Sequence, residues 1–288
     1  MKDQAYQLRL KMLQSTNSPA KSIAVVSGKG GVGKSNFSTN LSILIGKENA
    51  KVLLFDLDIG MGNIHILLGS HAEYSIMDYL ESPDINIDEI IAKDVHGISY
   101  ISGGNGLQDI IDWQQEKIER FLTAMDYLMM EYDYIVFDMG AGATQQTLEF
   151  LMIMDKILVV TTPEPTSLTD AYSMIKYIHK RNENKNFFLV CNRAESKKEG
   201  METINRLRTT TIKFLNKDIA SLGFLPEDPT VKKSVSQQCP FVIGYPKSPV
   251  SLSLQSIAEK LITGKMKGSE KNEKEPFIKQ LRNLFFGR

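Results

Sequence analysis

The chain is predicted to fold as an α/β protein with a doubly wound, mostly parallel sheet, and three observations predict this. Short apolar runs rich in Val, Ile and Phe recur along it without polar alternation, as in strands covered on both faces. Longer amphipathic stretches separate these runs, which is typical of the crossover helices of a parallel sheet. With 288 residues, 42% of them hydrophobic, the chain can bury a full core.

The strands and helices follow from these runs in order. Seven runs are predicted as strands, at residues 23–27, 52–56, 98–102, 134–138, 157–161, 187–191 and 220–225. Helices are clearest at residues 114–130, 167–181 and 200–215. Ligands of such sheets bind beyond the carboxyl ends of the strands, so residues that directly follow a strand are the candidates for a site.

The sequence divides into a segment 1–20, a body 21–263, a polar linker 264–276 and an apolar C-terminal segment 277–288. It shows neither an apolar leader nor an apolar run of membrane-spanning length, so we expect neither secretion nor a transmembrane helix. Its 34 basic and 34 acidic side chains give a net charge of zero, which argues against nucleic acid as a partner. The two cysteines lie too far apart in sequence for a disulfide framework or a C-x-x-C iron–sulfur ligand pair, and fit a reducing cytoplasm.

A glycine-rich loop follows the first predicted strand and precedes a helical stretch. It matches the pattern G-x-x-x-x-G-K-[ST] with Gly28, Lys29, Gly30, Gly31, Val32, Gly33, Lys34 and Ser35. Glycines let backbone N–H groups approach phosphate oxygens, and the helix N-terminus adds positive potential. In such loops the lysine reaches the β- and γ-phosphates and the hydroxyl binds Mg²⁺. The sequence therefore predicts a nucleotide and Mg²⁺ as cofactors and a sheet of the P-loop NTPase type.

Carboxylates leave two further strand ends. Asp56 and Asp58 are two residues apart and hence lie on one face of the chain. Asp138 ends another strand and is followed by two glycines, Gly140 and Gly142, which could adapt around a phosphate. A loop cap or turn residue is the usual role of a single aspartate in such a place. Three carboxylates at strand ends favour one shared site.

Lys29 is the most specific residue of the loop. The form K-G-G-V-G-K-[ST] resembles the signature of the deviant Walker A ATPases, the superfamily of MinD, ParA and the nitrogenase iron protein. The resemblance implies that ATP is sandwiched in a homodimer and that Lys29 reaches the partner's phosphates, where a second cation stabilises developing charge. It also implies that Asp56 contacts the metal shell, that Asp58 orients the attacking water, and that Asp138 holds Mg²⁺ indirectly.

Asn192 and Arg193 end a further strand and resemble the V-x-N-R segment with which similar ATPases read adenine. An asparagine amide can donate and accept at once, which suits the edge of the base. Residues 223–228 resemble the second base-contacting segment of these ATPases. Asp228 has an alternative role, as the N-cap of the next helix.

Several segments resemble the FlhG family of flagellar-number regulators, also called YlxH or FleN, among them residues 102–107 and 162–172. Residues 3–9 resemble the D-Q-A-x-x-L-R motif of that family, which folds as a helix on the flagellar signal-recognition-type GTPase FlhF and stimulates its hydrolysis. The resemblance implies that Gln4 helps to orient a water there. An unstructured leader is the alternative, because isolated helices of this length are marginal. One departure is Met61-Gly62, where MinD carries a bulkier pair.

The C-terminal segment has an amphipathic pattern. An arc of roughly 120°, at about 100° per residue, collects Phe277, Ile278, Leu281, Leu284 and Phe285. Apolar burial together with nearby basic residues is typical of a helix on an anionic membrane surface. A terminal helix docked on the body is the alternative. We expect docking in the monomer and release when ATP closes the dimer.

The sequence therefore predicts a cytoplasmic ATPase switch that dimerises with ATP, associates with the inner face of the membrane, and controls the number and placement of flagella. FlhF and basal-body switch proteins are the partners that the resemblance implies. The alternatives are a regulatory module whose main output is GTPase activation, a MinD-type division-site ATPase, and a ParA-type DNA partition ATPase. The last would show salt-sensitive DNA binding.

Overall fold

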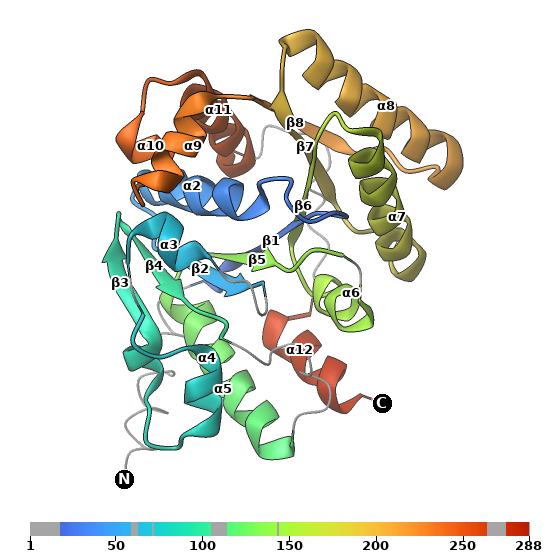
Figure 1. Ribbon diagram of the computed structural model, residues 1–288. Helices are drawn as coiled ribbons and strands as arrows, with labels where there is room; N and C mark the ends of the chain where they lie inside the picture. The colour runs from blue at the N-terminus through green and yellow to red at the C-terminus, as the bar shows by residue number, and fades with distance from the viewer. Residues whose placement is uncertain are drawn as a thin grey trace.

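The computed structural model describes residues 18–58, 63–70, 72–104, 114–142, 144–263 and 275–287. Within them an eight-stranded sheet has the order β3-β4-β2-β5-β1-β6-β7-β8 (Figure 1). Its strands are β1 Lys21–Val26, β2 Val52–Leu57, β3 Ile91–Val95, β4 Ile98–Ile101, β5 Tyr134–Met139, β6 Lys156–Thr161, β7 Phe187–Ala194 and β8 Ala220–Pro226. Every neighbouring pair is parallel except β3 with β4. The predicted doubly wound, mostly parallel sheet is confirmed.

Some predictions lie outside the described residues. They concern the N-terminal motif with Gln4, the pair Met61-Gly62, and the linker residues 264–274.

The edge strand β3 was not predicted from the sequence. Along Ile91–Val95 burial decreases from the first residue, and Lys93 and Asp94 face solvent. The strand pairs antiparallel with β4 and its register shifts between Ala92 and Val95. A strand at the sheet edge, half exposed, lacks the continuous apolar run that marks the central strands.

Helices cover both faces of the sheet (Figure 1). One face is covered by α2 Lys34–Gly46, α3 Ile64–Leu68, α9 Pro229–Ser236, α10 Phe241–Gly244 and α11 Pro249–Thr263. The other is covered by α4 Ile76–Glu81, the 3₁₀ turn η1 Ile87–Ile90, α5 Gln115–Glu131, α6 Gln145–Leu151, α7 Pro165–Arg181, α8 Lys197–Leu215 and α12 Phe277–Phe286. No helix among the described residues combines the length and apolarity needed to cross a bilayer.

The three predicted helices correspond to α5, α7 and α8. α8 begins three residues earlier than predicted, because the Ser196 hydroxyl accepts a hydrogen bond from the Glu199 amide and caps a charged first turn. α7 begins at Pro165, where the fixed proline φ suits the first helical position. Hydrophobic periodicity detects neither a capping serine nor a proline at the first helical position, so it places both starts too late.

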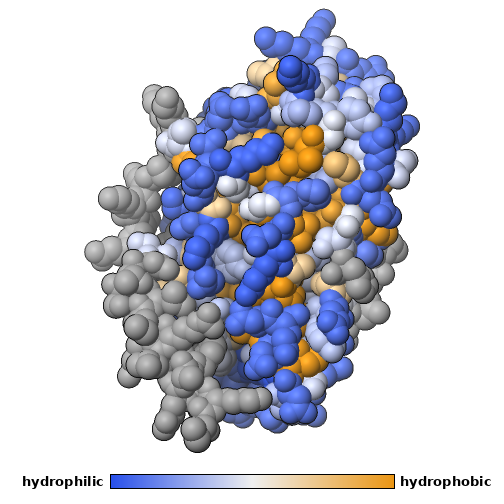
Figure 2. Space-filling view, turned by 90° about the vertical axis from the view of Figure 1, so that its left-hand side faces the viewer, coloured by the Kyte–Doolittle hydropathy of each residue, from blue (hydrophilic) through white to orange (hydrophobic). Residues whose placement is uncertain are grey.

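The flank formed by β3, α3 and α10 is not uniformly polar. Viewed from this side, apolar side chains form bands between hydrophilic ones (Figure 2). Ile66 of α3 is 37% exposed and Ile243 of α10 is 36% exposed.

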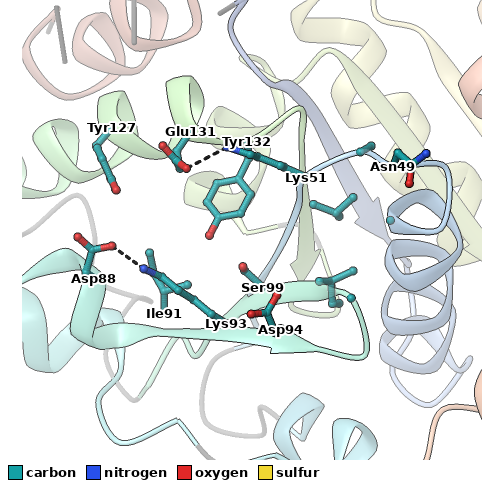
Figure 3. Close-up of a pocket in the computed structure, with 15 residues that line it drawn as sticks. Asn49, Lys51, Asp88, Ile91, Lys93, Asp94, Ser99, Tyr127, Glu131 and Tyr132 are labelled. Carbon is teal, nitrogen blue, oxygen red and sulfur yellow. Dashed lines mark hydrogen bonds and ion pairs between the residues drawn. The ribbon is translucent and has the colours of Figure 1, made fainter. Parts of the chain in front are cut away.

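A cavity of about 440 Å³ lies at the amino-terminal end of β2 (Figure 3). Two ion pairs face each other across it, Lys51 with Glu131 at 3.2 Å and Lys93 with Asp88 at 2.9 Å. Because the strands of a doubly wound sheet present ligand sites at their carboxyl ends, this cavity is at the wrong end for the predicted nucleotide site.

Candidate nucleotide site

The predicted phosphate loop and carboxylates meet at the carboxyl edge of the central strands. The loop follows β1, Asp56 lies near the end of β2, and Asp138 lies near the end of β5. The strand register places Asp138 beside Asp56 on one side and Val25 of β1 on the other. Alignment of parallel strands thus brings together three segments that are far apart in sequence.

Lys34 is the buried cation of the site. It is the first residue of α2, its side chain is 5% exposed, and its Nζ lies 3.0 Å from Asp138 Oδ1 and 3.6 Å from Asp58 Oδ2. Burying both charges costs desolvation free energy, which their mutual attraction must offset. The contacts hold Lys34 between the two carboxylates at the helix N-terminus.

Two glycines of the loop are required by its geometry. Gly33 has a φ of +87°, and a Cβ there would lie 2.5 Å from Asn192 Nδ2. A Cβ on Gly28 would lie 2.2 Å from the backbone carbon of Asp170 in α7. The loop therefore packs directly against α7 and Asn192. Of the other loop residues, Gly30 and Gly31 are exposed, Ser35 is half-buried and Val32 is buried.

The two strand carboxylates are buried and incompletely paired. Asp56 is 2% exposed and Asp138 0%. Asp56 Oδ1 accepts a hydrogen bond from the Asp58 amide at 3.0 Å, but the Oδ2 atoms of Asp56 and Asp138 have no partner among the described residues. Burial, and then the charge on Asp138, raise the pKa of Asp56 to about 7, against the lowering effect of the Asp58 amide and of Lys34.

This donor set fits Mg²⁺. Carboxylate oxygens are hard ligands, and Mg²⁺ is usually held by one or two carboxylates together with substrate phosphates. The two unpartnered oxygens supply such carboxylates beside a phosphate loop. The described residues contain no cluster of three or more His, Cys, Asp or Glu side chains able to hold a metal ion alone. A Mg²⁺ site whose remaining ligands are phosphate oxygens of the nucleotide does not need such a cluster of protein side chains.

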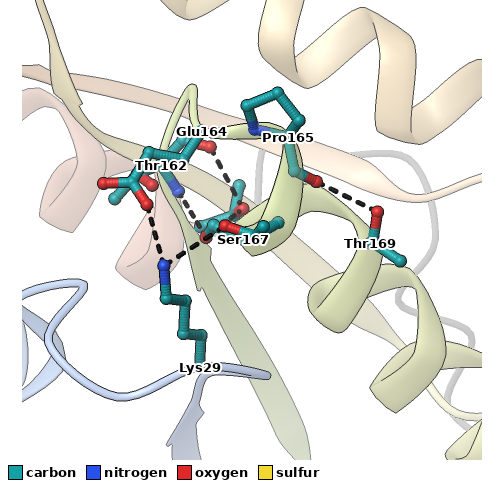
Figure 4. Close-up of polar contacts among 8 residues, drawn as sticks. Lys29, Thr162, Glu164, Pro165, Ser167 and Thr169 are labelled. Carbon is teal, nitrogen blue, oxygen red and sulfur yellow. Dashed lines mark hydrogen bonds and ion pairs between the residues drawn. The ribbon is translucent and has the colours of Figure 1, made fainter.

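Lys29 contacts its own chain across the loop. Its Nζ lies 2.9 Å from Glu164 Oε2 and 3.2 Å from the Thr166 hydroxyl (Figure 4). Glu164 is the N-cap residue of α7, and the Ser167 hydroxyl accepts a hydrogen bond from the Thr162 amide at 3.0 Å. The signature lysine is thus held at the start of α7.

Asn192 holds the phosphate loop. Its Nδ2 donates to the Val32 carbonyl at 2.7 Å, and its Oδ1 accepts from the Arg193 amide at 3.0 Å. Arg193 has a φ of +58°, in the left-handed region, and its Nε lies 3.9 Å from Glu227 Oε2. A cavity of about 50 Å³, whose lining includes Gly33, Asn192 and Arg193, lies at the predicted position of the base. The base contact itself stays a prediction.

Asp228 is confirmed as a helix cap. Its side chain accepts from the Thr230 amide at 2.9 Å and begins α9. Burial alone would raise its pKa, but the hydrogen bonds from Thr230 and from the Val250 amide together outweigh burial and lower it.

α12 is docked on the body in this structure. Phe277 and Leu281 are buried, Phe277 stacks on Phe137 at 6.4 Å, and Phe285 meets Phe121 edge-on at 6.3 Å. Ile278 and Phe285 are partly buried against the same core, and Leu284 is half-buried. The apolar arc therefore faces the protein here, in the docked arrangement expected for the monomer, and its contact with a membrane stays a prediction.

Two residues without a role in the sequence analysis lie at this site. Glu164 comes shortly after the end of β6, and this position after a strand could have marked it as a candidate site residue. Tyr100 is a fully buried residue of β4, and nothing in its apolar surroundings marks it as functional.

A strand, a glycine-rich loop and a helix N-terminus with a buried lysine between two aspartates together define a P-loop NTPase. The family model described as "ParA: NUBPL iron-transfer P-loop NTPase" matches residues 18–262. The antiactivator FleN of Pseudomonas aeruginosa is 28% identical over 263 residues, which cover 91% of this chain and 94% of FleN. The flagellum site-determining protein YlxH of Helicobacter pylori is 34% identical over 275 residues, covering 92% of this chain and 90% of YlxH.

Among solved structures, the MinC:MinD cell division protein complex of Aquifex aeolicus matches with a TM-score of 0.68 and 25% identity. The match covers 89% of this chain and 99% of that one. The chain belongs to the MinD/ParA family of P-loop NTPases and, within that family, to the FlhG type. The resemblance stated from the loop around Lys29 is confirmed.

Proposed function

We propose that the chain is an ATPase switch that binds ATP with Mg²⁺ at the loop following β1 and hydrolyses it to ADP and phosphate. The observation that carries the proposal is the position of Lys34, buried at the start of α2 between Asp138 and Asp58. Bound Mg²⁺ would neutralise phosphate charge. The loop amides and Lys34 would bind the phosphates, and Ser35, Asp56 and Asp138 would hold the ion.

Asp58 is the proposed residue that orients the attacking water. Its amide is fixed by Asp56 Oδ1 and its carboxylate lies 3.6 Å from Lys34 Nζ, so it stands beside the group that would bind the terminal phosphates. Asn192 and Arg193 would contact the base. These roles draw on the carboxyl ends of four strands, of which β2, β5 and β1 are neighbours while β7 is separated from β1 by β6.

We propose that ATP closes a homodimer in which Lys29 leaves Glu164 and binds the partner's phosphates. Lys29 is 42% exposed and Glu164 is 59% exposed, so both side chains are accessible to a second chain. Exposed ion pairs contribute little stability, which makes the exchange inexpensive.

The proposed location is the cytoplasm and the inner face of the membrane. α12 would be the membrane contact, because its apolar arc is flanked by the exposed cations Lys279 and Arg282. The arc is covered in the docked form, so membrane binding requires its release.

The proposed output is control of flagellar number and placement. The names of the relatives, antiactivator FleN and flagellum site-determining protein YlxH, support it. Stimulation of the GTPase FlhF through Gln4 and contact with basal-body switch proteins belong to the same proposal. A MinD-type role in division is the second candidate, supported by the match to the Aquifex MinD complex.

Purified full-length chain is assayed for phosphate release from Mg-ATP, as wild type, Lys34→Ala and Lys51→Ala. Lys51 is a matched control because it is 62% exposed at the opposite end of the sheet. We expect hydrolysis by wild type and Lys51→Ala, and none by Lys34→Ala. Equal hydrolysis by all three would refute the site. A deletion strain then separates the outputs, since altered flagellar number supports the first candidate and misplaced septa support the second.

A further inference from the structure

Three buried polar atoms without a partner lie on one face of the sheet at this site. They are Asp56 Oδ2, Asp138 Oδ2 and the Tyr100 hydroxyl, none of which makes a well-formed hydrogen bond among the described residues, although Asp56 and Ser102 lie near enough to the Tyr100 hydroxyl to affect its pKa. Tyr100 is 0% exposed. Burying an unpaired polar group costs free energy, so each of the three needs a partner in the working form of the site.

The strand register places these atoms together. Tyr100 of β4 pairs with Leu54 of β2, and Asp56 pairs with Asp138 of β5. Because side chains two residues apart share a face, Tyr100, Asp56 and Asp138 all point toward the face that α2 covers. β4 is the direct neighbour of β2 and is separated from β5 by it, so Asp56 is the nearer carboxylate.

The Tyr100 hydroxyl keeps its proton and can therefore donate a hydrogen bond. A tyrosine hydroxyl is ordinarily protonated at neutral pH, and burial raises the pKa of this one further, against the lowering effect of Ser102. Asp138 already uses one oxygen to accept from Lys34. A protonated hydroxyl beside an unpartnered carboxylate oxygen is a donor facing an acceptor.

We propose that Tyr100 is a positioning residue for Asp56, donating its hydroxyl proton to the free carboxylate oxygen directly or through one bridging water. The inference rests on the proposed function, because the oriented carboxylate is the one that would hold Mg²⁺ with the nucleotide. Groups that orient a metal ligand from behind change metal affinity by about 10- to 100-fold when removed. Tyr100 would act in this way without touching ATP.

The test is Tyr100→Phe in the full chain loaded with ADP, titrated with Mn²⁺ and followed by electron paramagnetic resonance. We expect Mn²⁺ to bind about tenfold more weakly, with ADP affinity in EDTA unchanged. Tyr134→Phe is the matched control, because Tyr134 is 7% exposed in the same core at the other end of β5. Mn²⁺ affinity of Tyr100→Phe equal to that of wild type would overturn the inference.

The Mn²⁺ titration separates the two possible failures. If wild type with ADP binds no Mn²⁺, the proposed function fails. If wild type binds it and Tyr100→Phe binds it equally, this inference alone fails.

Two further measurements complete the test. Thermal unfolding in EDTA tests whether Tyr100 has a merely structural role. Removing the proposed hydrogen bond should lower the midpoint by at most about 2–4 °C, and a larger fall would show that the substitution disturbs the core and would count against the proposal. In an Asp56→Asn background, Tyr100→Phe should have no further effect on Mn²⁺ binding.

Discussion

The Nζ atom of Lys29 lies 2.9 Å from Oε2 of Glu164, 135 residues further along the same chain. The lysine expected to reach a partner's phosphates is therefore held at the N-terminus of its own α7. An exposed ion pair of this kind contributes about 0.2–1 kcal/mol of stability. The contact therefore favours this position of the lysine side chain but does not fix it there. In the proposed dimer this contact would compete only weakly with the partner's phosphates.

Replacing Glu164 by Gln should strengthen the ATP-dependent dimer. The substitution removes the charge that holds Lys29 and keeps the size of the side chain. Because the homodimer breaks two such pairs, each worth at most about 1 kcal/mol, we expect a dimer dissociation constant lower by up to about 30-fold. Sedimentation velocity with ATP and the Asp58→Ala substitution, which would prevent turnover, measures it.

Glu131→Gln is the control for this experiment, since Glu131 forms a comparable exposed pair with Lys51 away from the site. It should leave the dimer unchanged. A dimer weakened by Glu164→Gln would mean that Glu164 contributes inside the dimer rather than against it.

The buried pair of Lys34 and Asp138 should behave differently from the exposed one. Lys34→Met leaves Asp138, which is 0% exposed, without its cation. Breaking a buried pair on one side typically costs about 3–5 kcal/mol. We therefore expect urea unfolding of the nucleotide-free chain to show a loss of that order. Lys34→Met combined with Asp138→Asn should recover part of it, and a double variant no more stable than Lys34→Met would contradict this account.

The raised pKa of Asp56 predicts a pH dependence of stability. Its pKa is raised from the ordinary 3.8 to about 7 in the folded chain, so the folded state binds this proton more tightly than the unfolded state does. The resulting stability is fully present below about pH 4, is lost as pH rises toward 7, and is absent above that. The total is on the order of a few kcal/mol.

Urea unfolding in EDTA at several pH values measures this dependence. Asp56→Asn cannot titrate and should flatten the profile between pH 4 and 7, while Asp88→Asn, a carboxylate of the distant cavity, should not. An unchanged slope in Asp56→Asn would assign the titration to another group.

The sequence was sufficient for the features that depend on local pattern. Continuous apolar runs located the central strands, and the loop motif located Lys34 at the start of a helix, because both signals lie within a few neighbouring residues. β3 was missed because its exposed Lys93 and Asp94 interrupt any apolar run.

What could not be predicted are partners far apart in sequence. Periodicity indicates which face of an element is buried, but not that Lys29 meets Glu164 or that Tyr100 shares a face with Asp56. These contacts follow from the strand order, in which β4 lies beside β2 and β6 beside β1. For α12, the sequence offered both a membrane surface and docking on the body, and the structure shows the docked form.

β5 connects the nucleotide site to the docked helix α12. The contacts that hold α12 predict how the helix can be released. Asp138 faces the site, and its neighbour Phe137 stacks on Phe277 of α12 on the opposite face of the sheet. On the exposed side, Arg282 of α12 pairs with Glu119 of α5 at 3.1 Å. Glu119→Arg reverses that charge and should weaken docking while leaving the apolar arc intact.

Co-sedimentation with anionic vesicles measures the release. We expect Glu119→Arg to pellet with vesicles in ADP as well as in ATP, whereas wild type pellets with ATP alone. Glu116→Arg is the matched control, because it makes the same charge change at an exposed position of α5. A truncation ending at Glu275 should abolish pelleting in every case. Pelleting of Glu119→Arg that survives this truncation would show that the added positive charge, and not α12, binds the lipid.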